Sequence, residues 1–236
     1  MPRPTTKTVF WRGLRDGSPF ILVMGPFATL FGVVASEAGL RVFEALAFSV
    51  LVLAGAAQFA ALQVLREDAP TIIAIVTALA INLRMAMYTA ALTPWLGAAP
   101  FWQRAVVTYF VVDQTYAYSV NAYETNTDWD LPRKLAYFFG VAAPIIPFWY
   151  GATLVGAWLG KSIPPELALD FAVPIAFIAL VTPMLRSAAH VAAAFVGVTV
   201  SLLLAWLPHS TGILMAGLLG MMTGAYVELR LKGAAR

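Results

Sequence analysis

The sequence predicts an all-α, polytopic integral membrane protein, and three observations lead to this fold class. Hydrophobic residues make up 61% of the 236 residues, and the mean hydropathy is +0.79. Charged residues make up 11%, less than half of the roughly 25% found in soluble domains. Long apolar segments recur along the whole chain. Together these features exclude a soluble domain, a disordered chain and a nucleic-acid-binding protein.

Eight segments are long and apolar enough to be membrane-spanning helices, because about 20 mostly apolar residues cross roughly 30 Å of hydrocarbon. They are expected at residues 18–36, 44–65, 70–92, 105–123, 135–159, 166–185, 187–207 and 212–229. Strands of a membrane barrel would alternate polar and apolar residues over about ten positions, and these segments do not. Almost nothing separates the sixth and seventh segments, so a re-entrant segment with seven full crossings is the alternative.

The basic residues set the expected orientation, because Lys and Arg concentrate on the cytoplasmic side of membrane helices. Residues 1–17 are expected to be an uncleaved cytoplasmic segment, 18–229 the helical bundle and 230–236 a cytoplasmic tail, in one transmembrane domain over 1–236. Eight spans then place 11 basic residues inside and three outside. The inner ones are Arg3, Lys7, Arg12, Arg15, Arg66, Arg133, Lys134, Arg186, Arg230, Lys232 and Arg236, and the outer ones are Arg41, Arg104 and Lys161.

Glycine and proline interrupt the first and fifth spans. Gly25 and Pro26 lie in the first, and Pro144 and Pro147 lie in the fifth. Proline frees a backbone carbonyl, and freed groups at membrane depth are tolerated where protein or a watery cavity satisfies them. Interrupted spans at matching positions of two halves indicate a transporter's binding site, so these four residues are expected to break the helices or act as hinges. Kinks that serve only packing are the alternative.

A weak internal repeat supports the same idea. Gly32 and Gly156 are 124 residues apart, and residues 45, 46 and 48 recur as residues 168, 169 and 171. Trp149 lies in the middle of the fifth span, where core packing is its more frequent role.

Two ionisable residues lie well inside predicted spans, Arg84 in the third and Asp113 in the fourth. At about 1.5 Å per residue, both lie roughly 18 Å from the cytoplasmic side of adjacent antiparallel helices. Such residues are costly in the bilayer and mark either function or close pairing. One reading is a structural ion pair. The other is that Arg84 binds a substrate carboxylate while Asp113 takes up and releases a proton.

Further polar side chains accompany these charges. Asn82 precedes Arg84, Gln114 follows Asp113, Gln58 lies in a stretch of small residues, and Tyr88 is one helical turn beyond Arg84. They are expected to bind substrate, with hydrogen bonds between helices as the alternative for the amides and packing as the alternative for Tyr88.

Signatures of an enzyme are absent from the sequence. The chain contains no cysteine, and its two histidines, His190 and His209, lack the spacing of a zinc site. There is no nucleophile elbow and no glycine-rich phosphate loop. We therefore expect no catalytic residues, no metal and no cofactor.

Four stretches of the chain form a recognisable set. They are Gly25-Pro26-Phe27 with residues 31–40, Glu44-Ala45 with Ala54-Gly55-Ala56-Ala57-Gln58-Phe59-Ala60-Ala61-Leu62, Asn82-Leu83-Arg84 with Tyr88, Leu92 and Pro94, and Leu169-Asp170-Phe171-Ala172-Val173-Pro174 with Phe177, Leu180 and Pro183. Over nearly its whole length the chain resembles the AzlC family of branched-chain amino acid exporter subunits, and Asp113-Gln114 matches that family's acidic position. It departs from the family at Ala57, where serine is frequent, and at Met85, where histidine is frequent.

The resemblance implies efflux of valine, leucine or isoleucine, or of methionine and analogues, across the bacterial inner membrane. It also implies a small AzlD-type membrane partner, and a homo-oligomer is equally compatible with the sequence. Arg84 or freed backbone N–H groups would hold the substrate carboxylate, Asp113 with Gln58 or Asn82 the ammonium, and Phe59 the aliphatic side chain. Because Met85 removes an imidazole, proton coupling is assigned to Asp113. The alternatives are an uncoupled channel or facilitator for a small polar solute, and a scaffold subunit of a two-component exporter.

Overall fold

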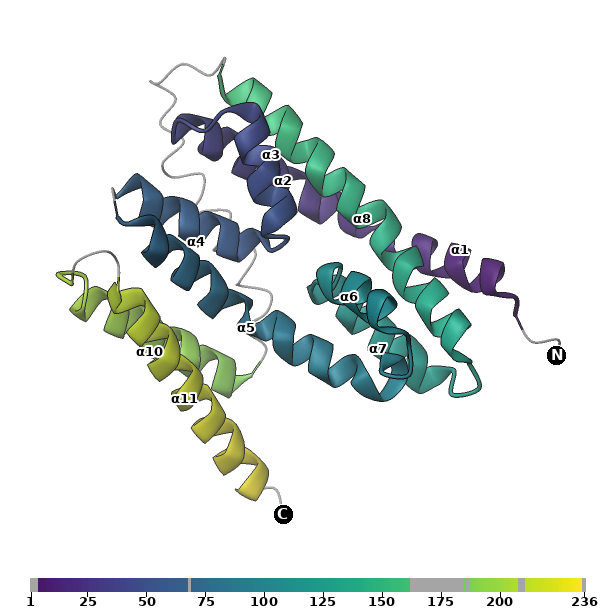
Figure 1. The fold of residues 1–236 in the computed structure, drawn as a ribbon. Coiled ribbons are helices and arrows are strands. Elements are labelled where there is room, and N and C mark those ends of the chain that lie inside the picture. Colours follow the sequence, from purple (N-terminus) through teal and green to yellow (C-terminus); the bar gives the residue numbers. More distant parts are fainter. Residues whose placement is uncertain (1–3, 68, 162–184, 186, 208–210, 235–236) are drawn as a thin grey trace. The chain divides into compact units, whose positions relative to one another are not determined.

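The computed structural model describes residues 4–67, 69–161, 185, 187–207 and 211–234. These residues form ten α-helices and contain no β-strand, which confirms the predicted all-α class (Figure 1). Four helices are long and apolar enough to cross a membrane: α2 (Phe20–Glu37), α5 (Thr71–Leu96), α8 (Leu131–Gly160) and the first part of α11 (Thr211–Ala234). Two shorter apolar helices, α3 (Val42–Leu51) and α10 (Ala188–Leu203), accompany them.

Two of the predicted spans are each built from two short helices. The second span consists of α3 and α4 (Gly55–Arg66), separated by residues 52–54. The fourth consists of α6 (Phe101–Tyr109) and α7 (Asp113–Thr125), separated by residues 110–112. Nearly all of the sixth predicted span lies outside the described residues, so the choice between seven and eight spans stays a prediction.

The expected interruptions of the first and fifth spans are absent. Pro26 lies inside the continuous helix α2, and Pro144 and Pro147 lie inside the continuous helix α8. A proline removes only one donor from a helix, and close packing against neighbouring helices stabilises the segment around it. Gly25 serves such packing, because a Cβ atom there would come within 2.9 Å of the Phe148 ring. The prediction of broken helices at these four residues was therefore wrong.

Helix α8 is the central element of the larger part of the molecule. Its 30 residues span about 45 Å, and both α1 (Thr6–Gly17) and α2 pack along it (Figure 1). A Cβ atom on Gly13 would meet the Tyr137 carbonyl, and one on Gly32 would meet the Thr153 carbonyl, so α1 and α2 run parallel to α8. Small residues permit this close approach.

Gly32 and Gly156 face each other at the crossing of α2 and α8. Both glycines therefore serve the packing of α2 against α8. The residues that would complete the proposed repeat, 168, 169 and 171, lie outside the described residues.

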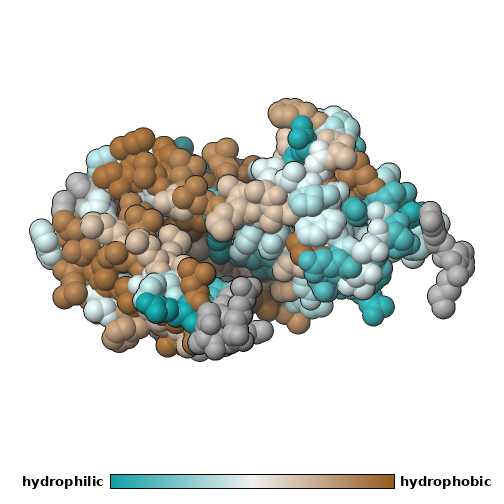
Figure 2. Space-filling view, turned by 90° about the horizontal axis from the view of Figure 1, so that it is seen from below, coloured by the Kyte–Doolittle hydropathy of each residue, from teal (hydrophilic) through white to brown (hydrophobic). Residues whose placement is uncertain are grey.

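The chain divides into two compact units, residues 1–62 with 81–165 and residues 63–80 with 166–236. In the second unit, α10 and α11 pack as an antiparallel pair, with Gly220 against Ala193 and Gly224 against Ala189. Hydrophobic side chains cover much of the surface in Figure 2, and hydrophilic ones gather at the end where Figure 1 places the N-terminus. All the candidate site residues lie in the first unit.

Candidate functional site

The two intramembrane charges form an ion pair. Nη1 of Arg84, on α5, lies 3.2 Å from Oδ2 of Asp113, the first residue of α7. The side chains are 34% and 39% exposed, so the pair is not sealed in the protein core. Arg84 Nε and Asp113 Oδ1 are buried, and neither has a hydrogen-bond partner in the described part of the chain. The pair therefore keeps one unused donor and one unused acceptor.

The break between α6 and α7 places Asp113 at the start of a helix. A carboxylate there is stabilised by the positive end of the helix dipole. Thr115 stabilises the break, because its hydroxyl accepts from the Val112 N–H at 2.8 Å and lies 3.0 Å from the carbonyl oxygens of both Phe110 and Val112. The start of α7 thus carries its own negative charge, and the Thr115 side chain forms hydrogen bonds with the backbone of the break.

Two tyrosines form an aromatic wall beside the pair. The rings of Tyr88 and Tyr116 stack with centroids 4.3 Å apart and planes inclined by 11°. Tyr88 lies four residues after Arg84 and interacts electrostatically with both Arg84 and Asp113. The predicted grouping of Arg84, Tyr88 and Asp113 is therefore present in the structure.

A second polar cluster is neutral and fully buried. Gln58, on α4, donates from Nε2 to Oγ of Ser49 on α3 at 3.0 Å. Ser49 in turn shares a hydrogen bond of 3.2 Å with Thr153 on α8. All three residues have no exposed surface. No hydrogen bond joins Gln58 to Arg84 or Asp113 within the described residues, so the predicted site residues form two groups.

The remaining predicted residues lie close to one group or the other. Phe59 is buried and packs edge-on against Phe27 and Phe31 near the neutral cluster. Oδ1 of Asn82 is buried without a partner in the described part of the chain. Gln114 is half-buried beside Asp113. Their roles in binding stay predictions.

Sequence reasoning missed the residues that connect the two helix breaks. The hydroxyl of Tyr109, the last residue of α6, donates to the Val50 carbonyl of α3 at 2.8 Å. Tyr109 and Tyr150 share a hydrogen bond of 2.7 Å. Because the proton of Tyr109 is used on Val50, Tyr150 is the donor of this second bond. Tyr109 lies near the start of the fourth predicted span, where tyrosine is typical of an interfacial anchor, and Tyr150 lies inside the fifth, so their sequence positions alone did not reveal this connection.

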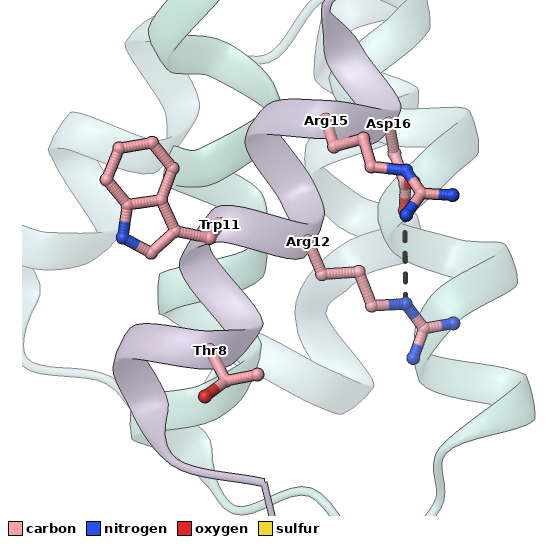
Figure 3. Close-up of a pocket in the computed structure, with 5 residues that line it drawn as sticks. All are labelled: Thr8, Trp11, Arg12, Arg15 and Asp16. Atoms are coloured by element: carbon pink, nitrogen blue, oxygen red, sulfur yellow. Dashed lines mark ion pairs between the residues drawn. The ribbon is translucent and has the colours of Figure 1, made fainter.

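An open hollow lies on α1, away from the ion pair. Its lining residues are Thr8, Trp11, Arg12, Arg15 and Asp16, all from one helix face (Figure 3). Arg12 lies over the Trp129 ring, and Asp16 accepts a hydrogen bond of 2.7 Å from Tyr137 on α8. These contacts attach α1 to the start of α8 and indicate an anchoring role for this face.

Comparisons with known proteins agree with the membrane architecture. The family model described as AzlC protein matches residues 19–163. An uncharacterized membrane protein of Archaeoglobus fulgidus is 28% identical, over 92% of this chain and 95% of its own length. The inner membrane protein YgaZ of Escherichia coli is 25% identical, over 99% of this chain and 96% of its own length. No solved structure matches the chain significantly. The family model covers more than half of the chain, and both relatives are membrane proteins that align with nearly all of it. This protein is therefore a multi-pass membrane protein of the AzlC family.

Proposed function

We propose that this protein is a secondary transporter that exports branched-chain amino acids, or methionine and related analogues, across the bacterial inner membrane. The whole chain would act as one transmembrane transporter domain and would catalyse no chemical reaction. The observation that carries the proposal is the Arg84–Asp113 ion pair, partly exposed and placed where a helix breaks. Ionisable groups in such positions mark substrate or proton pathways.

The chemistry of an amino acid matches the groups available. Its carboxylate requires donors, which Arg84 or backbone N–H groups at a helix break supply. Its ammonium requires acceptors, which Asp113 and the amide oxygens of Gln58, Asn82 and Gln114 supply. Its aliphatic side chain requires an apolar wall, and Phe59 and Tyr88 are adjacent to the two polar groups.

Proton coupling follows from the ion pair. Protonation of Asp113 removes its charge and releases Arg84, whereas deprotonation restores their attraction. Helices joined by an ion pair that forms and breaks with protonation can alternate between two arrangements. Coupled transport requires such an alternation. Asp113 is thus the proposed coupling residue.

Reconstitution tests the coupling. Proteoliposomes loaded with radiolabelled valine or leucine receive an imposed pH gradient, and efflux is compared for the unmodified protein, Asp113→Asn and Asp128→Asn. The gradient is expected to drive concentrative transport in the unmodified protein and in Asp128→Asn, whose change lies in the loop between α7 and α8. Asp113→Asn should exchange substrate without responding to the gradient.

Two outcomes contradict the proposal. An unchanged gradient response in Asp113→Asn removes that residue from coupling. Transport that never proceeds against a substrate gradient identifies an uncoupled channel or facilitator instead.

We also propose that a small AzlD-type membrane subunit accompanies the chain, alone or in a homo-oligomer. Efflux should therefore be measured with and without that subunit. Arg84→Ala separates a transporter from a scaffold subunit: a transporter variant assembles with the partner and fails to transport, whereas a scaffold variant fails to assemble.

A further inference from the structure

The start of α4 carries backbone donors that no group in the described part of the chain satisfies. The Gln58 N–H bonds to the Ala54 carbonyl, so intrahelical bonding begins there. The preceding N–H groups, of Gly55, Ala56 and Ala57, have no acceptor within the described residues. Ala54 has no side-chain oxygen to cap them, and no acidic residue lies in the first turn of α4. Three aligned donors are thus left at the positive end of a helix.

The position of these donors makes their lack of a partner costly. They lie in the middle of the second predicted span, where the bilayer supplies no water. A polar backbone group at that depth is tolerated where protein or a polar ligand satisfies it. Ala57 is fully buried, so exposure to solvent at the protein surface does not satisfy its N–H.

Two buried side chains next to the same helix start also lack partners. The indole N–H of Trp149, a residue that is 3% exposed, has no acceptor in the described part of the chain, and Oε1 of the fully buried Gln58 has no donor there. The Trp149 ring packs against the first residue of α4, since a Cβ atom on Gly55 would lie 2.9 Å from its Cη2. Gln58 lies less than one turn further along, and helical side chains lean towards the N-terminus.

The groups without partners indicate which kind of ligand would satisfy them. They comprise four donors, three from the backbone and one from Trp149, and a single acceptor, the Gln58 oxygen. A helix start with free N–H groups favours an anion. A single neutral water would meet some of these hydrogen bonds but would not use the positive field. A carboxylate meets the donors, and an adjacent ammonium meets the Gln58 oxygen.

We propose that the start of α4 is the subsite for the carboxylate of the transported amino acid, with Trp149 donating to that carboxylate and Gln58 accepting from the ammonium. The inference rests on the proposed function. It assigns recognition of the carboxylate to backbone N–H groups and leaves Arg84 to its ion pair with Asp113.

Access to this subsite requires movement, because Gln58 and Trp149 are buried. The Val50 carbonyl, two residues before the break in the second span, is held by Tyr109 of α6. Tyr109 in turn lies four residues before Asp113, across the other break. The hydrogen bond between Tyr109 and Val50 thus connects the segment that carries Asp113 to the break that precedes the carboxylate subsite.

Ligands that differ in one group test the subsite. The full chain in detergent is heated with leucine, with isocaproate, which lacks the ammonium, or with isoamylamine, which lacks the carboxylate. Shifts of the unfolding midpoint measured over a range of concentrations give apparent affinities. Leucine and isocaproate should bind measurably, and isoamylamine should not.

Two variants and two matched controls locate the binding. Trp149→Phe keeps the ring but removes the indole donor, and should weaken both carboxylate ligands about tenfold. Ala54→Ser supplies α4 with its own cap, and should weaken them several-fold while raising the unliganded midpoint. Trp158→Phe, on the exposed face of α8, and Ala60→Ser, beyond the first turn of α4, should leave binding unchanged.

The possible results separate this inference from the proposed function. Equal affinities in Trp149→Phe, Ala54→Ser and the unmodified chain overturn the subsite even where leucine is still exported. Binding of isocaproate that depends on Trp149, without export of any branched-chain amino acid or of methionine, upholds a carboxylate subsite at the start of α4 and overturns the proposed function. Lack of any midpoint shift with either carboxylate overturns both.

Discussion

The breaks in the second and fourth predicted spans have similar backbone arrangements but differ in the side chains at the helix start that follows. In each, about three residues separate a short helix from a second helix that starts in the middle of a predicted span. The start of α7 carries the Asp113 carboxylate in its first turn, and the Thr115 hydroxyl accepts from the Val112 N–H just before it. The start of α4 carries only small apolar residues in its first turn before Gln58. One helix start therefore carries its own negative charge, and the other carries none.

We infer from this difference that the two helix starts have different roles. A helix start that already contains a carboxylate offers a charge that a proton can switch. A helix start without one offers free donors for the carboxylate of a substrate. The Tyr109 hydroxyl joins the two by holding the end of α3 from the end of α6. Coupling and recognition would then occupy neighbouring breaks rather than a single site.

The largest effect is expected from splitting the ion pair. Arg84→Gln alone leaves Asp113 without its counter-charge at membrane depth, and should abolish gradient-driven efflux and lower stability by about 1–3 kcal/mol. The double variant Arg84→Gln/Asp113→Asn should recover most of that stability, because neither charge remains, but should not recover coupling. Thermal unfolding of four proteins in detergent, namely the unmodified protein, Arg84→Gln, Asp113→Asn and the double variant, measures the interaction energy. A double variant less stable than Arg84→Gln would contradict this account of the pair.

Thr115→Val tests whether the Thr115 hydroxyl stabilises the break before α7. The buried hydroxyl is the acceptor for the Val112 N–H, so its loss should destabilise the protein by about 1–2 kcal/mol. Thr125→Val, an exposed change at the end of the same helix, should cost much less. Equal midpoints for the two variants would show that the Thr115 hydroxyl does not stabilise the break.

Tyr109→Phe tests the connection between the breaks and should have the smallest effect. Removing the hydroxyl frees the Val50 carbonyl and the Tyr150 hydroxyl without changing either helix start. The affinity for leucine should stay within about twofold, while the rate of gradient-driven efflux should fall several-fold, reflecting about 1 kcal/mol of lost interaction. Equilibrium binding and initial efflux rates, measured on one preparation, separate these quantities. A loss of affinity with an unchanged rate would place Tyr109 in the binding site.

The contact between Arg84 and Asp113 was predictable because depth in a membrane can be counted along a helix. Two opposite charges at equal depth on adjacent spans are each costly in the bilayer without a partner, so an ion pair between them is favoured. The positions of the helix breaks were not predictable in the same way. Proline marked the first and fifth spans, yet α2 and α8 continue through it, supported by glycine-mediated packing between helices far apart in the sequence.

The break at residues 110–112 contains neither glycine nor proline. Two β-branched valines and the Thr115 hydroxyl stabilise a non-helical turn there. In isolation, such residues are equally compatible with a continuous apolar helix. The hydrogen bond from Tyr109 to a distant carbonyl also favours the break, and a contact between remote segments leaves no local pattern in the sequence.

The sequence alone determined the membrane class, the all-α fold and the meeting of the two intramembrane charges, because hydropathy, helical rise and the cost of a buried charge are local quantities. Only the tertiary structure decided which spans are divided and which polar groups are left without partners. Those features depend on close approach between helices and on whether distant side chains satisfy a backbone donor. The groups at the start of α4 that have no partner among the described residues are therefore defined only by the packing of α3, α4 and α8.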